Sequence, residues 1–229
     1  MGAAKTLVSW SSGKDSAWTL HVLRQQGEHE IVGLVTTVNA AFDRVAMHAV
    51  PTKLLEQQAA AAGVRLWTVP IPHPCSNAEY EAAMGALFER ARATGVQRIA
   101  FGDLFLADIR AYRERQLADT GLTPVFPLWQ QPTRELAAEM LAAGLAAVIT
   151  CIDPKVLPPA FAGRAFDRQL LAELPPGIDP CGERGEFHTF AHAGPMFASP
   201  IPVTVGAVVE RDGFVFADLR AAGGHDDGQ

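Results

Sequence analysis

The first half of the chain alternates short apolar, β-branched runs with helical patterns, and this alternation most restricts the fold. Each helical pattern closes on a glycine. Strands that alternate with helices form right-handed βαβ units, which give a mostly parallel sheet covered on both faces. The sequence therefore predicts an α/β fold. The expected strands are 7–10, 31–38, 65–69 and 98–101, and the expected helices are 15–26, 51–62 and a segment from Ser76 to near Gly95.

The second half follows a different pattern. A helix is expected over 133–143 and a buried strand over 146–152. Two further apolar runs flank Asp212-Gly213, a dipeptide typical of a hairpin turn. This change of pattern predicts a smaller C-terminal α+β domain, and we place the division so that the domains are 1–118 and 119–229.

Composition restricts the function classes. Hydrophobic residues make up 48% of the chain and charged residues 19%, as in globular proteins. Lysine and arginine total 19 against 25 aspartate and glutamate, a net charge of −6, which disfavours general nucleic-acid binding. The sequence has no apolar run of about 18 residues that would cross a membrane and no signal-peptide pattern, so we expect a cytoplasmic protein.

The segment S-S-G-K-D-S stands between the first expected strand and the first expected helix. The unpaired N–H groups and the dipole of a helix start attract anions. The glycine allows close approach, the hydroxyls donate, Lys14 adds charge, and Asp15 can hold Mg²⁺ or cap the helix. A plain polar helix cap is the alternative. The candidate nucleotide ligands are Ser11, Ser12, Gly13, Lys14, Asp15 and Ser16.

This segment is not a Walker A loop. That motif needs a glycine at position 8, which is Val8, and Ser or Thr at position 15, which is Asp15.

Other candidates follow the expected strands, because ligands bind beyond the carboxyl ends of parallel strands. Thr36 follows the second strand, and Gly102 and Asp103 follow the fourth. Asp103 could bind metal or ribose, or cap the next helix. His48 is a candidate nucleotide contact or a surface histidine. The helix after Asp103 carries Arg110, Arg113 and Arg115, which reach either phosphate or solvent.

A second chemical cluster lies at C-G-E-R-G-E-F-H-T-F, residues 181–190. Its glycines permit a tight turn that would bring Glu183, Glu186 and His188 together. The carboxylates could coordinate Mg²⁺ or orient an amine, and His188 has a side chain suited to proton removal. A well-bonded structural loop is the alternative.

Residues 11–16 resemble the pyrophosphate loop of N-type ATP pyrophosphatases, written S-G-G-x-D-S. Within that superfamily the chain is similar to the diphthine–ammonia ligase family, and G-E-F-H-T is typical of a bacterial subgroup. Ser12 replaces the usual glycine, a change that is tolerable if the backbone dihedrals of that residue are ordinary. The further segments that carry the resemblance are M-H-A-V-P at 47–51 with the Gln-rich helix that follows it, F-G-D-L at 101–104, P-L-W at 127–129, residues 181–190, and Gly194-Pro195.

The resemblance implies a Rossmann-like (HUP) domain that binds ATP and Mg²⁺ and a second domain that binds the acceptor. It implies that ATP adenylates a carboxylate, that pyrophosphate leaves, and that ammonia or an amine forms an amide. The implied catalytic residues are Lys14, Asp15, Glu183, Glu186 and His188, with Asp15 on the metal.

Two alternatives stay open: another acceptor, such as a cobalamin precursor or a tRNA base, and a non-catalytic nucleotide-binding protein. The C-terminal hairpin favours a homodimer.

Overall fold

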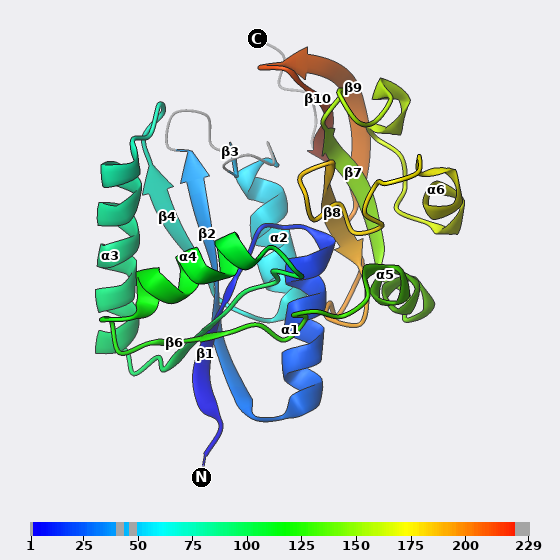
Figure 1. The fold of residues 1–229 in the computed structure, drawn as a ribbon. Coiled ribbons are helices and arrows are strands. Elements are labelled where there is room, and N and C mark those ends of the chain that lie inside the picture. The colour runs from blue at the N-terminus through cyan, green and yellow to red at the C-terminus, as the bar shows by residue number, and fades with distance from the viewer. Residues whose placement is uncertain (1, 40–43, 46–49, 223–229) are drawn as a thin grey trace.

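The computed structural model describes residues 2–39, 44–45 and 50–222, which form two sheets packed side by side (Figure 1). The first sheet has five parallel strands in the order β4-β2-β1-β5-β6. A two-residue strand, β3 (Arg44–Val45), pairs antiparallel with the end of β2. The parallel strands are β1 (Ala4–Ser9), β2 (His29–Asn39), β4 (Leu66–Ile71), β5 (Arg98–Ala100) and β6 (Thr123–Val125).

This strand order is that of a Rossmann-like fold, which confirms the expected parallel α/β architecture. From β1 the chain first builds outward through β2 and β4, and it then returns to place β5 and β6 on the other side of β1. The order therefore reverses between β1 and β5. In sheets of this kind, ligands bind at that reversal, beyond the carboxyl ends of the two strands.

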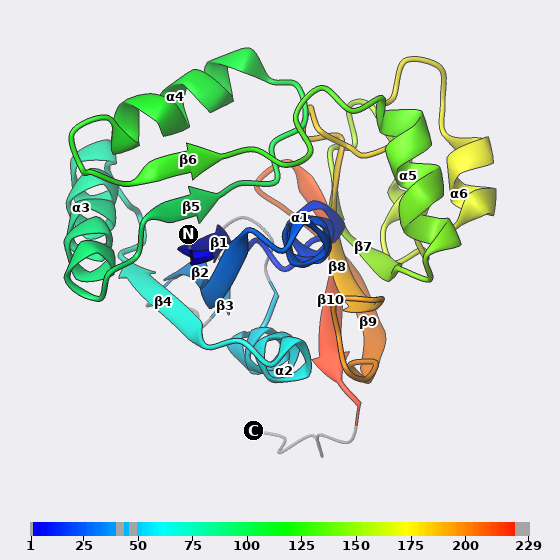
Figure 2. The ribbon, with the colours of Figure 1, turned by 90° about the horizontal axis from the view of Figure 1, so that it is seen from below.

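Helices cover both faces of the first sheet (Figure 2). Helices α3 (Asn77–Ala93) and α4 (Ala107–Leu117) lie on one face, and α1 (Lys14–Gln26) and α2 (Thr52–Ala62) lie on the other. The predicted capping box at the start of α3 is present: Ser76 Oγ accepts from the Glu79 N–H at 3.3 Å, and Glu79 Oε2 accepts from the Ser76 N–H at 2.8 Å. The helix patterns in the sequence therefore gave the elements correctly.

The second sheet is antiparallel, in the order β8-β7-β10-β9. Asp212 and Gly213 adopt φ values of 51° and 79°, so the predicted hairpin turn joins β9 to β10. The elements of this part are α5 (Thr133–Ala142), β7 (Ala146–Ile152), the 3₁₀ turn η1 (Pro159–Phe161), α6 (Arg168–Glu173), β8 (Phe187–Ala193), β9 (Val203–Arg211) and β10 (Phe214–Ala221).

The first sheet continues past residue 118, because β6 pairs with β5. The sequence did not predict this strand, because Pro124 argues against a strand in the middle of a sheet. Proline is tolerated here because β6 lies at the edge of the sheet. Strand pairing thus assigns residues up to Val125 to the first sheet, whereas the division into domains 1–118 and 119–229 stays a prediction about folding units.

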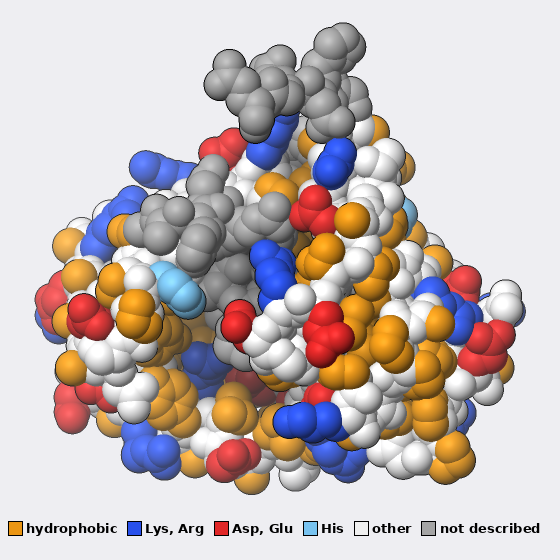
Figure 3. All heavy atoms as spheres, turned by 90° about the horizontal axis from the view of Figure 1, so that it is seen from above, with side chains coloured by type: hydrophobic (Ala, Val, Ile, Leu, Met, Phe, Trp, Pro, Cys, Tyr) orange, Lys and Arg blue, Asp and Glu red, His pale blue; other side chains and the backbone are white. Residues whose placement is uncertain are grey.

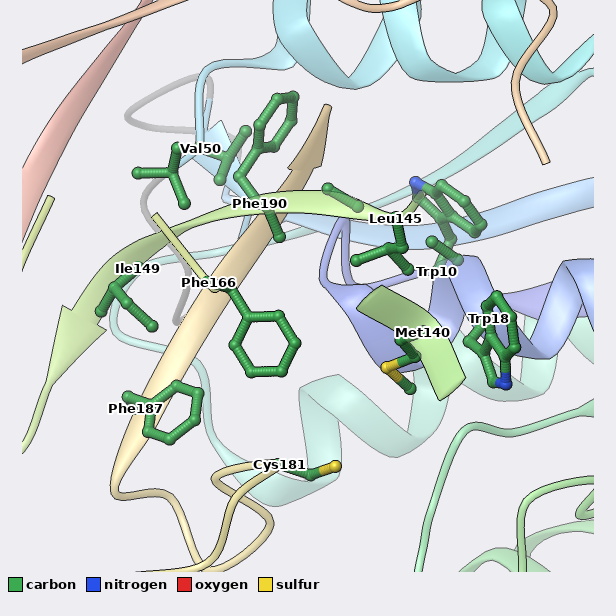
Figure 4. Packing of buried hydrophobic residues seen from close by; sticks show 14 of the residues in the cluster. Trp10, Trp18, Val50, Met140, Leu145, Ile149, Phe166, Cys181, Phe187 and Phe190 are labelled. Atoms are coloured by element: carbon green, nitrogen blue, oxygen red, sulfur yellow. The ribbon is translucent and has the colours of Figure 1, made fainter. Parts of the chain in front are cut away.

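One buried cluster joins the two sheets. Trp10 and Trp18 come from the first part of the chain, and they pack in the same cluster as Leu145 and Phe190 from the second (Figure 4). Helix α1 lies between the sheets and supplies Trp18 to this cluster (Figure 1). The relative position of the two sheets is therefore set by close packing of apolar side chains.

On the face seen in Figure 3, acidic and basic side chains are interspersed with apolar ones, and no continuous basic field is visible. Across the described ranges, no helix is long and apolar enough to cross a membrane.

Candidate active site at the strand-order reversal

A cavity of about 460 Å³ lies where the ends of β1 and β5 meet the second part of the chain. Three segments line it. The end of β1 and the start of α1 contribute Ser9, Ser11, Gly13, Lys14, Asp15 and Ser16. The segment after β5, with α4, contributes Phe101, Gly102, Asp103, Leu106, Ile109 and Arg113. The turn before β8 and the start of that strand contribute Cys181–Gly185 and Phe187–Thr189.

Buried hydrogen bonds hold the loop at 11–16 on the side that faces away from the cavity. Gln58, fully buried on α2, accepts from Trp10 Nε1 at 2.9 Å and donates to the carbonyls of Ser12 and Ala191 at 2.9 and 2.7 Å. The Ala191 N–H also donates to the Ser12 carbonyl at 2.9 Å. Strand β8 and helix α2 therefore fix the loop before any ligand arrives.

The side of the loop that lines the cavity carries the N–H groups of the first turn of α1 and the hydroxyls of Ser11 and Ser16. The first-turn N–H groups of α1 have no partner within the helix, and Gly13 precedes it without a side-chain cap. One of these groups, the Lys14 N–H, already donates to Thr189 Oγ1 at 3.1 Å. Ser11 Oγ donates to Ser16 Oγ at 3.2 Å, and Ser16 Oγ donates to the Gly13 carbonyl at 3.0 Å, so a ligand would replace these hydroxyl bonds. A Cβ on Gly13 would lie 3.2 Å from the Thr189 carbonyl, so β8 leaves little room for a side chain there. The geometry fits the anion-binding role expected of the loop.

Ser12 does not have ordinary backbone dihedrals. Its φ is 68°, in the left-handed region that favours glycine, so the condition under which serine replaces glycine without strain is not met. The side chain is fully buried, and its Oγ makes no hydrogen bond within the part of the chain described. Ser12 contributes its carbonyl to the support of the loop and does not line the cavity.

Lys14 is turned inward rather than toward solvent. Its side chain is 1% exposed, and Nζ donates to Asp15 Oδ2 at 2.8 Å, to Asp15 Oδ1 at 3.0 Å and to the carbonyl of Cys181. The rings of Phe166 and Phe187 each lie with their centroid 5.5 Å from Nζ, and both are drawn in Figure 4. Burial alone would lower the pKa of Lys14, but Asp15 outweighs it and raises the pKa, so the residue stays charged. The positive charge of Lys14 is therefore mostly compensated by Asp15 and by the carbonyl of Cys181.

The segment after β5 packs directly against the loop. A Cβ on Gly102 would lie 3.1 Å from the carbonyl of Asp15, so glycine permits this contact. The next residue, Asp103, has its Oδ2 3.8 Å from Arg113 Nε, and neither atom has a hydrogen-bond partner among the described residues. Burial raises the pKa of Asp103 against the lowering effect of Arg113. Asp103 does not cap α4, because that helix begins after Leu106 without a side-chain cap.

Glu183 ties the signature turn to the same segment. Its Oε1 accepts from the N–H groups of Leu104 at 2.8 Å and Phe105 at 3.4 Å. Burial raises the pKa of Glu183 to about 7, with the charges of Asp15 and Asp103 adding to the rise. A carboxyl group that titrates near neutral pH beside a cavity is typical of functional sites.

Glu186 and His188 differ in what they reach. Glu186 accepts from the N–H groups of Asp179 at 3.1 Å and Arg184 at 2.9 Å and does not line the cavity, so it shapes the turn. His188 does line it, and burial, with Lys14, lowers its pKa to about 4. The ring is therefore neutral at pH 7, the state that a general base requires.

Thr36, one of the predicted ligands, does not lie at the cavity. Thr36 is buried on β2, where its hydroxyl donates to the Trp10 carbonyl at 2.6 Å, and it does not line the cavity. Its role is to support the strand end, because its hydroxyl satisfies a buried carbonyl. His48 lies outside the described residues. Among the residues that are described, no group of three His, Cys, Asp or Glu side chains is placed to hold a metal ion by itself.

Sequence reasoning missed several residues of the site. Gln58 lies on the Gln-rich helix that carries part of the resemblance, but it was not singled out as a residue of the site. Leu106 and Ile109, which line the cavity beside Phe101, were not named as candidates. Thr189 was noted only as part of the signature, and its contact with the Lys14 N–H spans 175 residues of sequence. Contacts of that range have no local signature.

The sequence comparisons agree with this architecture. Residues 4–124 match the family model of the diphthamide synthase N-terminal domain, and residues 132–216 match that of the diphthamide synthase C-terminal domain. The chain is 27% identical over 232 residues to the diphthine–ammonia ligase of Bos taurus, an alignment that covers 91% of this chain and 86% of that protein. It is 31% identical over 130 residues to the diphthine–ammonia ligase of Homo sapiens, covering 54% of this chain and 48% of that protein. The N-terminal match alone spans more than half of the chain, which therefore belongs to the diphthamide synthase family of ligases.

Proposed function

We propose that this chain is an ATP-dependent ligase that adenylates a carboxylate, releases pyrophosphate, and lets ammonia or an amine convert the acyl-adenylate into an amide. The observation that carries the proposal is the cavity at the strand-order reversal. It is lined at once by the helix-start loop, by the segment after β5 and by the signature turn of the second part of the chain. A nucleotide and an acceptor can thus meet between the two sheets.

The N–H groups at the start of α1 and the hydroxyls of Ser11 and Ser16 would bind the departing pyrophosphate. They are fixed before binding by Gln58 and β8, so little reorganisation is needed when charge develops on the leaving group.

His188, neutral at pH 7, would accept a proton from the attacking amine. With a pKa of about 4, His188 is a weak base for removing a proton from the amine. The negative charge of a bound nucleotide would raise the pKa of His188 and make it a stronger base.

Mg²⁺ would neutralise phosphate charge beside the nucleotide, because this ion binds through one or two carboxylates together with phosphates. Asp103 fits that role, since its Oδ2 has no hydrogen-bond partner in the described ranges. Asp15, the predicted metal residue, holds both its oxygens against Lys14, so its negative charge is already balanced.

The names of the relatives, diphthine–ammonia ligases, support a proposal for the acceptor and the nitrogen source. We propose a carboxylate of that chemical class, amidated by ammonia. Modification of a tRNA base is disfavoured by the net charge of −6.

The test is to incubate the protein with ATP, Mg²⁺, ammonium and a panel of acids that includes a diphthine-bearing protein. The acids carry ¹⁸O in the carboxylate. We expect AMP and pyrophosphate, with one ¹⁸O atom in the AMP, because the carboxylate oxygen attacks the α-phosphorus. ADP with inorganic phosphate, or AMP without ¹⁸O, would contradict adenylation. Nucleotide binding measured by calorimetry without an acceptor separates a missing acceptor from a missing ATP site.

A further inference from the structure

The cations that line the cavity are not equally available to a ligand. Three are present: Lys14, Arg113 and Arg184. Lys14 is 1% exposed and bonded to Asp15 and Cys181. The Arg184 side chain is 58% exposed and lies 3.7 Å from Glu186. Arg113 is 24% exposed and makes no hydrogen bond within the described residues.

Arg113 is also held in a fixed place. Its guanidinium lies 5.0 Å from the ring centroid of Phe101, and its Nε is 3.8 Å from Asp103 Oδ2. Phe101, Gly102 and Asp103 follow β5 directly, and Gly102 touches the backbone of Asp15 in the helix-start loop. The stack and the ion pair therefore orient a planar donor next to the loop, with its terminal nitrogens left for a ligand.

Arg110, one turn earlier on α4, shows what a fully engaged arginine looks like here. It lies 4.8 Å from the ring centroids of both Phe126 and Trp129, donates to Glu114 at 2.8 Å, and does not line the cavity. The two side chains share a helix and a type of aromatic contact, and they differ in whether a partner takes their donors.

We propose that Arg113, and not Lys14, supplies the positive charge that binds the α-phosphate of the nucleotide. This inference rests on the proposed function, in which the amides at the start of α1 hold the pyrophosphate. Arg113 lines the cavity from α4 beside Asp103, whereas the pyrophosphate is assigned to the start of α1, so we assign Arg113 to the phosphate next to the pyrophosphate. The stack on Phe101 keeps Arg113 in place, so that an anionic ligand meets one fixed cation beside the reacting atom.

The test is calorimetric binding of two probes, α,β-methylene-ATP with Mg²⁺ and inorganic pyrophosphate, to the wild type, Arg113→Gln and the matched control Arg110→Gln. Loss of one charge-assisted hydrogen bond corresponds to about a tenfold rise in Kd. We expect that rise for the nucleotide analogue with Arg113→Gln, with pyrophosphate binding changed by less than about twofold. Arg110→Gln should leave both within about twofold.

Equal binding by Arg113→Gln and the wild type would overturn the inference and leave the proposed function standing. A loss that is as large for pyrophosphate as for the analogue would also overturn it, because it would move Arg113 to the terminal phosphates. If the wild type binds neither probe, the proposed function falls as well. Arg113→Lys, which keeps the charge but lacks the planar fork, should restore part of the affinity and guards against a folding defect in Arg113→Gln.

Discussion

The two walls of the cavity use their residues in different ways. The helix-start loop at 11–16 offers backbone N–H groups and hydroxyls, and its support lies behind it, in Gln58 and β8. The signature turn offers charged side chains, but most of their oxygens hold the structure itself. Glu186 bonds the turn, and Glu183 bonds the segment after β5.

This contrast shows how a chemical motif divides its work. Backbone donors at a helix start are available because the helix cannot satisfy them. A carboxylate beside a tight turn has many N–H groups within reach, so it is readily consumed by the turn. A conspicuous cluster such as G-E-R-G-E-F-H therefore contains both residues that face a ligand and residues that make the shape.

The contrast depends on the support behind the loop, and Gln58→Leu removes that support. Trp10 Nε1 and the Ala191 carbonyl lose the bond to Gln58 in a buried place, and the Ser12 carbonyl keeps only its bond from the Ala191 N–H. We expect the free energy of unfolding to fall by about 3 kcal/mol, with weaker nucleotide binding, measured by urea unfolding and calorimetry. Gln57→Leu is the matched control, since Gln57 Oε1 has no hydrogen-bond partner within the described ranges. A similar loss in both variants would show that Gln58 is not specific to the loop.

The contribution of Glu183, in the signature turn, can be measured from the pH dependence of stability. Its pKa in the folded protein is about 7 against an ordinary 4.5, so the folded state binds the proton more tightly over that interval. The ionised group therefore costs stability, and wild-type stability should decline as pH rises from about 4.5 to 7. After allowance for partial exposure, the decline attributable to Glu183 is about 1–2 kcal/mol.

The measurement is urea unfolding of the wild type and Glu183→Gln at pH 5 and pH 8. Glutamine keeps an acceptor for Leu104 but does not titrate, so the variant should gain stability relative to the wild type at pH 8. Glu81→Gln, at an exposed position on α3, serves as the control. A constant difference between the wild type and Glu183→Gln at the two pH values would mean that Glu183 does not titrate in this range.

The smallest effect on stability is expected for Ser12→Gly, in the helix-start loop. Glycine relieves the left-handed backbone and removes a buried hydroxyl without a partner among the described residues. We expect the free energy of unfolding to rise by about 1 kcal/mol, seen as a higher Tm. Ser11→Gly should lower it, because the Ser11 hydroxyl bonds Gly13 and Ser16. If Ser12→Gly destabilised the protein, its hydroxyl would have an unrecognised role.

Much of the fold was predictable because its signals are local. The helices from Ser76 and around 133–143, the strand at 146–152 and the turn at Asp212-Gly213 follow from capping residues, periodicity and turn chemistry. The strand at Thr123–Val125 was not assigned, since Pro124 is tolerated only because β6 is an edge. The helix-start loop was found for the same local reason, since strand, glycine and helix follow one another within ten residues.

The roles of individual site residues were less predictable. Lys14 reads as a phosphate ligand beside Gly13, yet its Nζ bonds the carbonyl of Cys181, 167 residues away. Thr36 stands at the right end of its strand and still points at a backbone carbonyl. Which way a side chain turns depends on neighbours that the local sequence does not contain.

The sequence was enough to predict the alternating elements, the parallel sheet, the glycine-containing loop at the start of α1 and the resemblance to diphthine–ammonia ligases, because all of these depend on the order and spacing of nearby residues. Only the tertiary structure decided that Lys14 serves Asp15 and Cys181, that Glu186 holds the turn, and that Arg113 faces the cavity without a hydrogen bond in the described residues. Those outcomes depend on which donors and acceptors meet when the two sheets pack together. A buried polar group needs a hydrogen-bond partner, so a group that finds none in the protein is available to bind a ligand.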